Sequence, residues 1–313
     1  MVPDSGLPGR LARLLADDAL IILLFHGVIG QQRRGVRNYT NKHMEADLFA
    51  DCMRALAVAG TAISMDDVLV RSQTGEPYPP RAFAVTFDDG FANNLSVAAP
   101  ILDDFAVPAT VYVTTGFIDT NGMSWFDRIE CAVESAPRQT VRVEWTDAAF
   151  PLGDEATRVE FLDAVRAHVK SDPGCDADAF ADNLCERLGS TAPSVGDECL
   201  DTKLTWDQVR QLNGHPLFSV GGHSHTHAIL SFLPPDRLHL EVETSLRLLR
   251  DRAGVPPTHY SYPEGLRHCF SEPVVRELKG HGVQCCPTAI AGANRRGDDL
   301  FHLKRVMIGG RTR

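Results

Sequence analysis

The sequence predicts an α/β fold with a parallel sheet, and three observations carry that prediction. Short apolar runs alternate along the chain with segments of helical periodicity. Several of these runs are apolar on both faces, as in "RAFAVTF" at 81–87 and "ATVYVTT" at 109–115, which is typical of parallel strands covered on both sides. The number of expected strands, about seven, favours a barrel, complete or incomplete, over an open sheet.

The expected strands follow one another with helical segments between them. They are residues 19–28, 61–65, 82–87, 109–115, 217–221, 258–263 and 282–288. The first of them, "ALIILLFHGVIG" with its continuation to residue 30, is the one candidate for a signal peptide. Asp17 and Asp18 flank it, His26 interrupts it and no small-residue cleavage pattern follows, so we expect a buried strand instead.

Two helices have clear sequence signals. In "FANNLSVAAPILDDFAV" at 91–107, Asn93 or Asn94 could cap a helix whose apolar face holds Leu95, Ala98, Leu102 and Phe105. The second helix opens with the prolines at 234–235 and closes at Gly254. Its apolar stripe consists of Leu238, Val242, Leu246 and Leu249.

Residues from about 127 to 203 interrupt the strand–helix alternation. They are acidic, mostly helical or loop-like, and punctuated by stretches such as "SDPGCD" and "STAPSVGD". We expect an insertion over one end of the barrel and not an independent domain, so that residues 1–313 form a single domain.

Composition excludes some classes of partner. The chain has 313 residues, 43% of them hydrophobic, and a formal net charge of -10, which argues against nucleic acid or anionic lipid as the main partner. It lacks the run of about 18 apolar residues that a membrane-spanning helix needs. The eight cysteines form no C-x-x-C pair, and adjacent Cys285 and Cys286 would point to opposite faces of a strand, so we expect reduced thiols in a cytoplasmic protein.

Candidate chemistry begins with "TFDDG" at 86–90, where two aspartates stand at the carboxyl end of an expected strand. Active sites of parallel α/β folds are built at that end of the sheet. An alternative is that one aspartate only caps the helix that begins near Phe91.

The stretch "GGHSHTHAIL" at 221–230 follows another expected strand. His223 and His227 are four apart and could lie on one side of a helical turn, a spacing known from metal sites, whereas His225 would point elsewhere. The alternative is an ordinary polar loop. One aspartate with two neutral imidazoles would hold a divalent cation such as Zn²⁺ and leave a position open, while the second aspartate stays available as a general base.

A third stretch, "HYSYPEG" at 259–265, also ends an expected strand. Tyr262, Pro263 and Gly265 could form a rigid turn that aims a backbone N–H into the pocket, although the residues alone indicate only a turn. We therefore count Tyr262 and Pro263 among the candidate substrate-binding residues.

Taken together, the sequence resembles the polysaccharide deacetylases with NodB homology, carbohydrate esterase family 4. "TFDDG" is similar to the first motif of that family, and "HSHTH" at 223–227 fits its H-[ST]-x-x-H motif, in the same order and after strands. The resemblance implies a distorted (β/α) barrel of about seven strands. It also implies that Asp88 is the catalytic base and that Asp89, His223 and His227 are the ligands of one divalent metal, most simply Zn²⁺.

The chain also departs from the family pattern at several positions. "SYPEG" stands in place of R-P-P-Y-G, so Ser261 replaces the arginine that orients the base, and the N–H of Glu264 becomes the candidate oxyanion donor. The late L-x-H motif is not evident, and His302 in "FHLKRV" has the wrong context for it. "LLFHGV" resembles an early segment of the poly-N-acetylglucosamine deacetylases, which implies that His26 is the general acid, unless it is only hydrogen-bonded at a strand end.

"SWFDRIE" at 124–130 is a weaker candidate for substrate contact. Trp125 and Asp127 could supply a sugar-stacking ring and a hydroxyl acceptor, or they could be the packed start of the insertion.

The function expected from these residues is metal-dependent hydrolysis of the N-acetyl group of an amino sugar or an N-acetylglucosamine-containing glycan. Two alternatives are a catalytically degenerate carbohydrate-binding protein on the same scaffold and a related C–N hydrolase acting on a non-sugar amide. The residues argue against a phosphoryl-transfer enzyme of the D-x-D type, because the aspartates are adjacent and no Gly-rich phosphate loop with a lysine is present.

Overall fold

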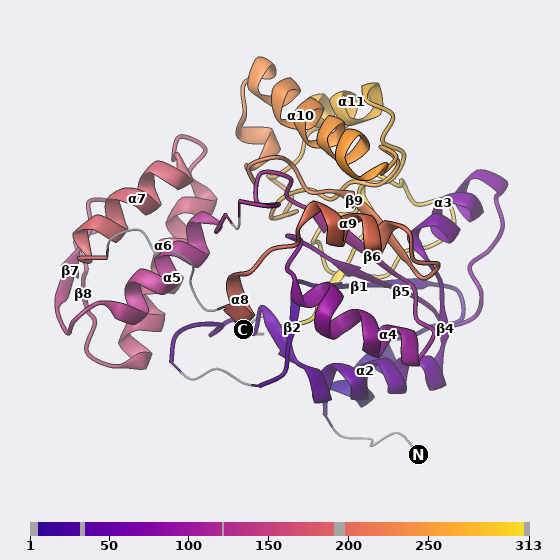
Figure 1. The fold of residues 1–313 in the computed structure, drawn as a ribbon, viewed down its shortest axis with the longest axis horizontal. Coiled ribbons are helices and arrows are strands. Elements are labelled where there is room, and N and C mark those ends of the chain that lie inside the picture. Colours follow the sequence, from indigo (N-terminus) through magenta and orange to yellow (C-terminus); the bar gives the residue numbers. More distant parts are fainter. Residues whose placement is uncertain (1–5, 32–34, 121, 191–197, 310–313) are drawn as a thin grey trace.

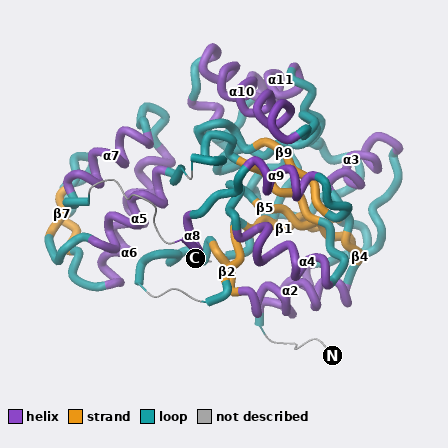
Figure 2. Tube along the Cα trace, in the orientation of Figure 1, coloured by secondary structure: helices purple, strands orange, loops and turns teal. Residues whose placement is uncertain are grey.

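A parallel sheet forms the centre of the protein in the computed structural model, which describes residues 6–31, 35–120, 122–190 and 198–309 (Figures 1 and 2). Its strands are hydrogen-bonded in the order β10 (Val306–Met307), β1 (Leu20–Phe25), β5 (Ala82–Phe87), β6 (Ala109–Val113) and β9 (Phe218–Gly222). The short β4 (Thr61–Ala62) pairs with the beginning of β5. All these ladders are parallel, which confirms the predicted α/β class.

The sheet curves towards closure through segments with little regular strand structure. Beyond β9, Gly222 bridges to Tyr260 and His259 bridges to Cys285, both in parallel orientation. Residues 286–290 then accept from or donate to the backbone of 300–305, and the same segment continues into β10 beside β1. The C-terminal segment therefore joins the last barrel positions to the first.

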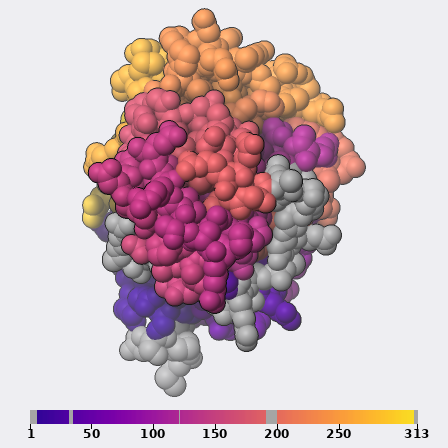
Figure 3. Space-filling model, turned by 90° about the vertical axis from the view of Figure 1, so that its left-hand side faces the viewer, coloured from indigo at the N-terminus to yellow at the C-terminus, as the bar shows by residue number. Residues whose placement is uncertain are grey.

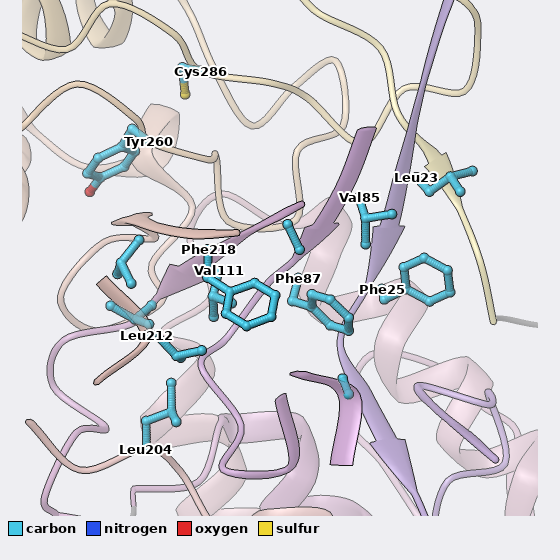
Figure 4. Packing of buried hydrophobic residues seen from close by; sticks show 14 of the residues in the cluster. Leu23, Phe25, Val85, Phe87, Val111, Leu204, Leu212, Phe218, Tyr260 and Cys286 are labelled. Carbon is cyan, nitrogen blue, oxygen red and sulfur yellow. The ribbon is translucent and has the colours of Figure 1, made fainter. Parts of the chain in front are cut away.

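Alternation along the strands separates an outer face from an inner face. In β5, Phe83, Val85 and Phe87 pack with the helices in the largest hydrophobic cluster, as Figure 4 shows for Val85 and Phe87. Ala82 and Ala84 belong to a second cluster on the opposite face, together with Leu20 and Ile22 of β1. Because the alternation of side chains between the two faces continues past the end of β5, Asp88 lies on the inner face.

Helices cover the outer face of the sheet (Figure 1). They are α1 (Leu7–Leu14), α2 (Ala46–Ala59), α4 (Ala99–Asp104), α9 (Trp206–Asn213), α10 (Pro235–Ala253) and α11 (Glu272–Gly280), with a π-helical turn at Asn94–Ala98 and a 3₁₀ turn at Leu230–Phe232. In contrast, α3 (Met65–Thr74) packs Met65 and Val68 into the second cluster, on the inner face. A separate parallel pair is formed by β2 (Gly27–Ile29) and β3 (His43–Glu45). In α10 the four predicted apolar positions are buried, and Gly254 ends the helix with φ 65° in the left-handed region.

The insertion forms a lobe beside the barrel, at the left of Figure 1 and towards the viewer in Figure 3. It contains α5 (Trp125–Ser135), the antiparallel pair β7 (Thr140–Arg142) and β8 (Ala149–Pro151), α6 (Glu155–Ser171) and α7 (Ala177–Arg187), followed by α8 (Glu198–Asp201). These helices share a hydrophobic cluster of their own, which also includes Val36. The stretch "STAPSVGD" lies largely outside the described residues, which resume at 198.

The structure corrects several predicted boundaries. The expected strands 258–263 and 282–288 make only isolated bridges, and Pro287 inside the second of them has no N–H to donate to a ladder. The expected first strand divides into β1 and β2 at His26. Neither Asn93 nor Asn94 caps a helix by its side chain: Asn93 Oδ1 accepts from the N–H of Val28, and Asn94 donates to the carbonyl of His26.

Among the described residues, no helix combines the length and apolar character that crossing a membrane requires. The seven cysteines whose side chains are described are unpaired thiols, whereas the side chain of Cys199 lies outside the described part of the chain.

Candidate active site

Two sequence-distant segments meet at the carboxyl ends of neighbouring strands. Asp88 and Asp89 follow β5, and the histidines of "HSHTH" follow β9, with β6 between them in the sheet. This is the edge at which parallel α/β folds place their active sites.

Asp89, His223 and His227 present three ligand atoms to one point. The Oδ1 atom of Asp89 lies 3.5 Å from Nε2 of His223 and 3.3 Å from Nε2 of His227. Asp89 is 4% exposed and His223 is 1% exposed, and Oδ1 of Asp89 has no hydrogen-bond partner among the described residues. A buried carboxylate oxygen in that position is costly unless a cation shares it.

The tautomer of His223 strengthens the case for a cation. Its Nδ1 lies 2.9 Å from the carbonyl oxygen of Ser261, which can only accept, so Nδ1 carries the proton and Nε2 carries a lone pair. That lone pair faces the Asp89 oxygen. Two acceptors directed at one point, with a second imidazole beside them, fit a divalent metal with nitrogen and oxygen ligands.

The histidine segment is not the helical turn that the four-residue spacing predicted. Ser224 and His227 have φ values of 64° and 65°, and the N–H of His227 donates to Ser224 Oγ at 2.9 Å. Glu241 of α10 accepts from the N–H groups of His225 and Thr226. A sharp turn held by side chains therefore brings the two imidazoles together, and His225 points instead to Thr115, 3.0 Å from its Oγ1.

Asp88 is held by an arginine that the sequence motifs did not identify. The two terminal nitrogens of Arg305 donate to the two carboxylate oxygens of Asp88, each at 2.8 Å, and Arg305 is fully buried. Its Nη2 also donates to Ser261 Oγ at 2.8 Å. Burial alone would raise the pKa of Asp88, but Arg305 and then His223 hold that pKa below its usual value.

The expectation that the orienting arginine is absent is therefore wrong. Ser261 occupies its motif position, and Arg305 reaches the same carboxylate from "HLKRV" in the C-terminal segment. The partners are 217 positions apart. The only signal in the sequence that could have indicated this contact was the position of Arg305 next to the apolar residues 306–308.

A chain of charges continues from Asp89 towards the insertion. Nζ of Lys42 lies 2.9 Å from Asp89 Oδ2 and 3.2 Å from Asp127 Oδ1, and Lys203 Nζ lies 3.8 Å from Asp127 Oδ2. Burial would raise the pKa of Asp89, yet Lys42 and His227 hold it well below its usual range. Burial lowers the pKa of Lys203 to about 8. No sequence motif identified Lys42 or Lys203.

The aromatic and acidic residues predicted to contact sugar have a packing role instead. Trp125 is 8% exposed, belongs to the hydrophobic cluster of the insertion and meets the ring of Phe126 edge-on at 5.2 Å. Asp127 is 5% exposed and its carboxylate is paired with lysines. The structure contradicts the stacking role and supports the alternative that these residues are the packed start of the insertion.

The turn at Tyr262, Pro263 and Glu264 lies beside the candidate metal ligands. Tyr262 is fully buried and its hydroxyl donates to the carbonyl of Phe301 at 3.2 Å, so its side chain is part of the core and is not a substrate contact as predicted. Glu264 and Gly265 both have φ 60°, and a Cβ on Gly265 would lie 2.6 Å from Ala289 N. The backbone here is fixed in a conformation that requires glycine.

The carboxylate of Glu264 forms an ion pair with Lys170 of α6. Burial would raise the pKa of Glu264, but Lys170 and His227 lower it to about 2. The insertion therefore supplies a contact to the turn of the candidate site.

His26 lies at the junction of β1 and β2, next to the aspartate pair. The N–H of Asp88 donates to the carbonyl of Phe25 at 3.0 Å, and Asn94 fixes the carbonyl of His26 at 2.8 Å. The imidazole is half-buried. Burial lowers the pKa of His26 to about 4, although the nearby Asp89 acts in the opposite direction.

Comparison with known proteins places the chain in a family. The family described as "Polysaccharide deacetylase" matches residues 75–286. No curated protein matches the chain at a significant level.

Solved structures share the fold at low sequence identity. The Streptococcus pyogenes deacetylase PplD in complex with acetate is 16% identical, with a TM-score of 0.59 over 94% of this chain and 93% of that one. IcaB from Ammonifex degensii is also 16% identical, with a TM-score of 0.58 over 94% and 93%. The deacetylase domain of BpsB from Bordetella bronchiseptica is 19% identical, with a TM-score of 0.54 over 93% and 97%. Since the family match spans more than half of the sequence and includes both the aspartate pair and the histidine turn, this protein belongs to the polysaccharide deacetylase family.

Proposed function

We propose that the protein is a metal-dependent hydrolase that removes the N-acetyl group from an amino sugar or an N-acetylglucosamine-containing glycan and releases acetate. The observation that carries this proposal is the buried Asp89 oxygen, which faces the Nε2 atoms of two histidines beside an aspartate held by an arginine. Membership of the polysaccharide deacetylase family supports the carbohydrate substrate.

Asp89, His223 and His227 would hold one divalent cation, for which we propose Zn²⁺ because two imidazoles and a carboxylate with an open position suit that ion. When bound, such a cation polarises the amide carbonyl and lowers the pKa of water.

Asp88 is suited to take the proton of the attacking water. Its carboxylate is ionised at neutral pH, because Arg305 stabilises the charged form, and Arg305 also fixes its orientation with two parallel hydrogen bonds. In this mechanism the oxyanion that develops on the carbonyl accepts from the N–H of Glu264, whose backbone conformation is fixed by the turn at Gly265.

His26 would give a proton to the leaving nitrogen. With a pKa of about 4 the free ring is neutral at pH 7, so on this proposal it takes up a proton from solvent only as negative charge develops beside it during the reaction, and then passes that proton to the nitrogen. His26→Gln should therefore lower kcat more than it raises KM.

The arginine contact to Asp88 weakens the alternative of a degenerate carbohydrate-binding protein. It rested on the missing arginine and the missing late histidine motif, and Arg305 supplies the arginine contact. A C–N hydrolase acting on a non-sugar amide would use the same residues and differ only in the shape of the substrate pocket.

The test is an acetate-release assay on N-acetylated amino sugars and glycans, with the metal content of the purified protein measured in parallel. We expect acetate release that a chelator abolishes and that added Zn²⁺ restores. Tight sugar binding without acetate release at any divalent metal would favour the binding protein, and release from simple acetamides but not from sugars would favour the non-sugar hydrolase. The predicted cytoplasmic location stays a prediction.

A further inference from the structure

We propose that the protein has a second divalent cation site, separate from the candidate active site, formed by His239, Glu277 and His281 where α10 meets α11. The ligand class is a borderline transition-metal ion such as Zn²⁺, Ni²⁺ or Co²⁺. This inference does not depend on the proposed hydrolase function.

The three side chains converge from two helices. His239 is in the first half of α10, Glu277 is in α11, and His281 follows α11 one helical turn after Glu277. Nδ1 of His239 lies 2.7 Å and Nε2 of His281 lies 2.9 Å from the same oxygen, Oε1 of Glu277. One ligand atom from each residue lies within 4.8 Å of the other two.

The donor set and its position both suit a cation. Two imidazole nitrogens and a carboxylate are the ligands that Zn²⁺ and its neighbours prefer, and three protein ligands leave positions for water. The side chain of His239 is 60% exposed, whereas those of Glu277 and His281 are 26% and 23% exposed. The site is therefore open to solvent on one side and supported by packing on the other. The two histidines already turn towards Glu277, to which they donate, so binding an ion requires each ring to move that proton to its other nitrogen but little movement of the side chains.

This site is distinct from the candidate active site, although α10 contacts both. Glu241 of α10 faces inwards, is 7% exposed, and accepts from the backbone of the histidine turn. His239 is two residues earlier and lies on the outward side of the same helix. The ion would join α10 to α11, which lie side by side at the top of Figure 1, and would stabilise the pair.

The experiment measures bound Zn²⁺ per chain by equilibrium dialysis, after removal of metal with a chelator. We expect two ions in the wild type and one in His223→Ala/His227→Ala, which keeps only the α10–α11 site. We also expect one ion in His239→Ala/His281→Ala and none when all four histidines are replaced. If the candidate active site binds no metal, the wild type binds one ion, and this ion is still lost in His239→Ala/His281→Ala.

Thermal unfolding of His223→Ala/His227→Ala provides a second readout. Added Zn²⁺ should raise its Tm, and a further His239→Ala change should abolish the increase, since that exposed residue can be replaced with little effect on folding. The matched control is His302→Ala: His302 is also exposed and hydrogen-bonded to a carboxylate, Asp299, at 2.7 Å, but no second histidine accompanies it. The proposal is overturned if His223→Ala/His227→Ala binds no Zn²⁺, or if the ion survives replacement of His239 and His281.

Discussion

Asp88 and Asp89 are adjacent in the sequence but have different electrostatic surroundings. Asp88 follows the side-chain alternation of β5, lies on the inner face and pairs with Arg305. Asp89, with φ 74°, turns towards Lys42 and the two histidines. Each carboxylate therefore has its own cation partner, and the mutual repulsion of the pair is offset. The different partners also assign different tasks to the two side chains in our proposal.

The first prediction concerns that division. Asp88→Asn should retain metal and lose activity by about 10²–10⁴-fold, the usual contribution of a positioned general base. Asp89→Ala should lose the metal itself, because it removes one of three ligands. Metal content and acetate release are measured on the same samples. An Asp88→Asn enzyme with full activity would show that the base has been assigned to the wrong residue.

The second prediction concerns Lys42, which donates to the Asp89 oxygen that faces away from the histidines. Lys42→Met should weaken metal affinity by about 10–100-fold, as loss of a group that orients a ligand typically does. A competition titration with a chelating dye measures the affinity. Lys42→Arg should recover part of it, and Lys304→Met, at an exposed position, is the matched control. Unchanged affinity in Lys42→Met would contradict the orienting role.

At the scale of elements, α6 connects the insertion to the candidate site through the ion pair of Lys170 with Glu264. The third prediction is that Lys170→Met lowers kcat by about 10–10²-fold with a smaller change in KM, because the turn that carries the Glu264 N–H loses its anchor. Steady-state kinetics measure both constants. Glu264→Gln should have a similar effect, and the double variant should lose no more than either single one. Additive losses would show that the two residues act independently.

α5 carries a carboxylate that titrates near neutrality. Burial, and then the neighbouring Asp127, raise the pKa of Glu130 from 4.5 to about 7, against the opposing effect of Arg37. In the unfolded chain Glu130 loses its proton near pH 4.5, whereas the folded protein keeps it up to about pH 7. The folded state binds more protons in this window, so the contribution of Glu130 to stability falls as the pH rises from 4.5 to 7.

The fourth prediction follows from that sign. Glu130→Gln cannot ionise, so it lacks this loss of stability. Between pH 4.5 and pH 8 the free energy of unfolding of the wild type should fall by on the order of 2–3 kcal/mol more than that of the variant. Urea denaturation at the two pH values measures the difference. A difference between the two proteins that is independent of pH would show that folding does not raise the pKa of Glu130.

At the scale of the whole molecule, Arg305 links the segment that closes the barrel to the inner face of β5. Its Nε donates to the carbonyl of Thr288 at 2.7 Å, while its terminal nitrogens bind Asp88. Fold closure and orientation of the candidate base therefore depend on the same side chain.

The fifth prediction is that Arg305→Met destabilises the fold by about 3–5 kcal/mol, because Asp88 is left buried without its partner. Adding Asp88→Asn to that variant should recover part of the loss. Urea denaturation of the two single variants and the double variant gives the coupling energy. A coupling near zero would mean that the ion pair does not stabilise the folded protein.

The features that the sequence determined by itself are those that depend on patterns among neighbouring residues. Alternation of apolar runs with helical stripes fixes the parallel α/β class, and the ends of two such runs place Asp88, Asp89, His223 and His227 at one edge of the sheet. Side-chain periodicity and turn residues are properties of neighbouring positions, so they can be recognised without knowing the fold.

Only the tertiary structure decided which charges meet. Arg305, Lys42 and Lys170 come from the closing segment, a loop and the insertion, and none of them lies in a motif. The same packing buried Trp125 and Tyr262, which the sequence offered as substrate contacts. The free energy of a buried charge or ring depends on the atoms that surround it, and distant segments supply those atoms only when the barrel closes.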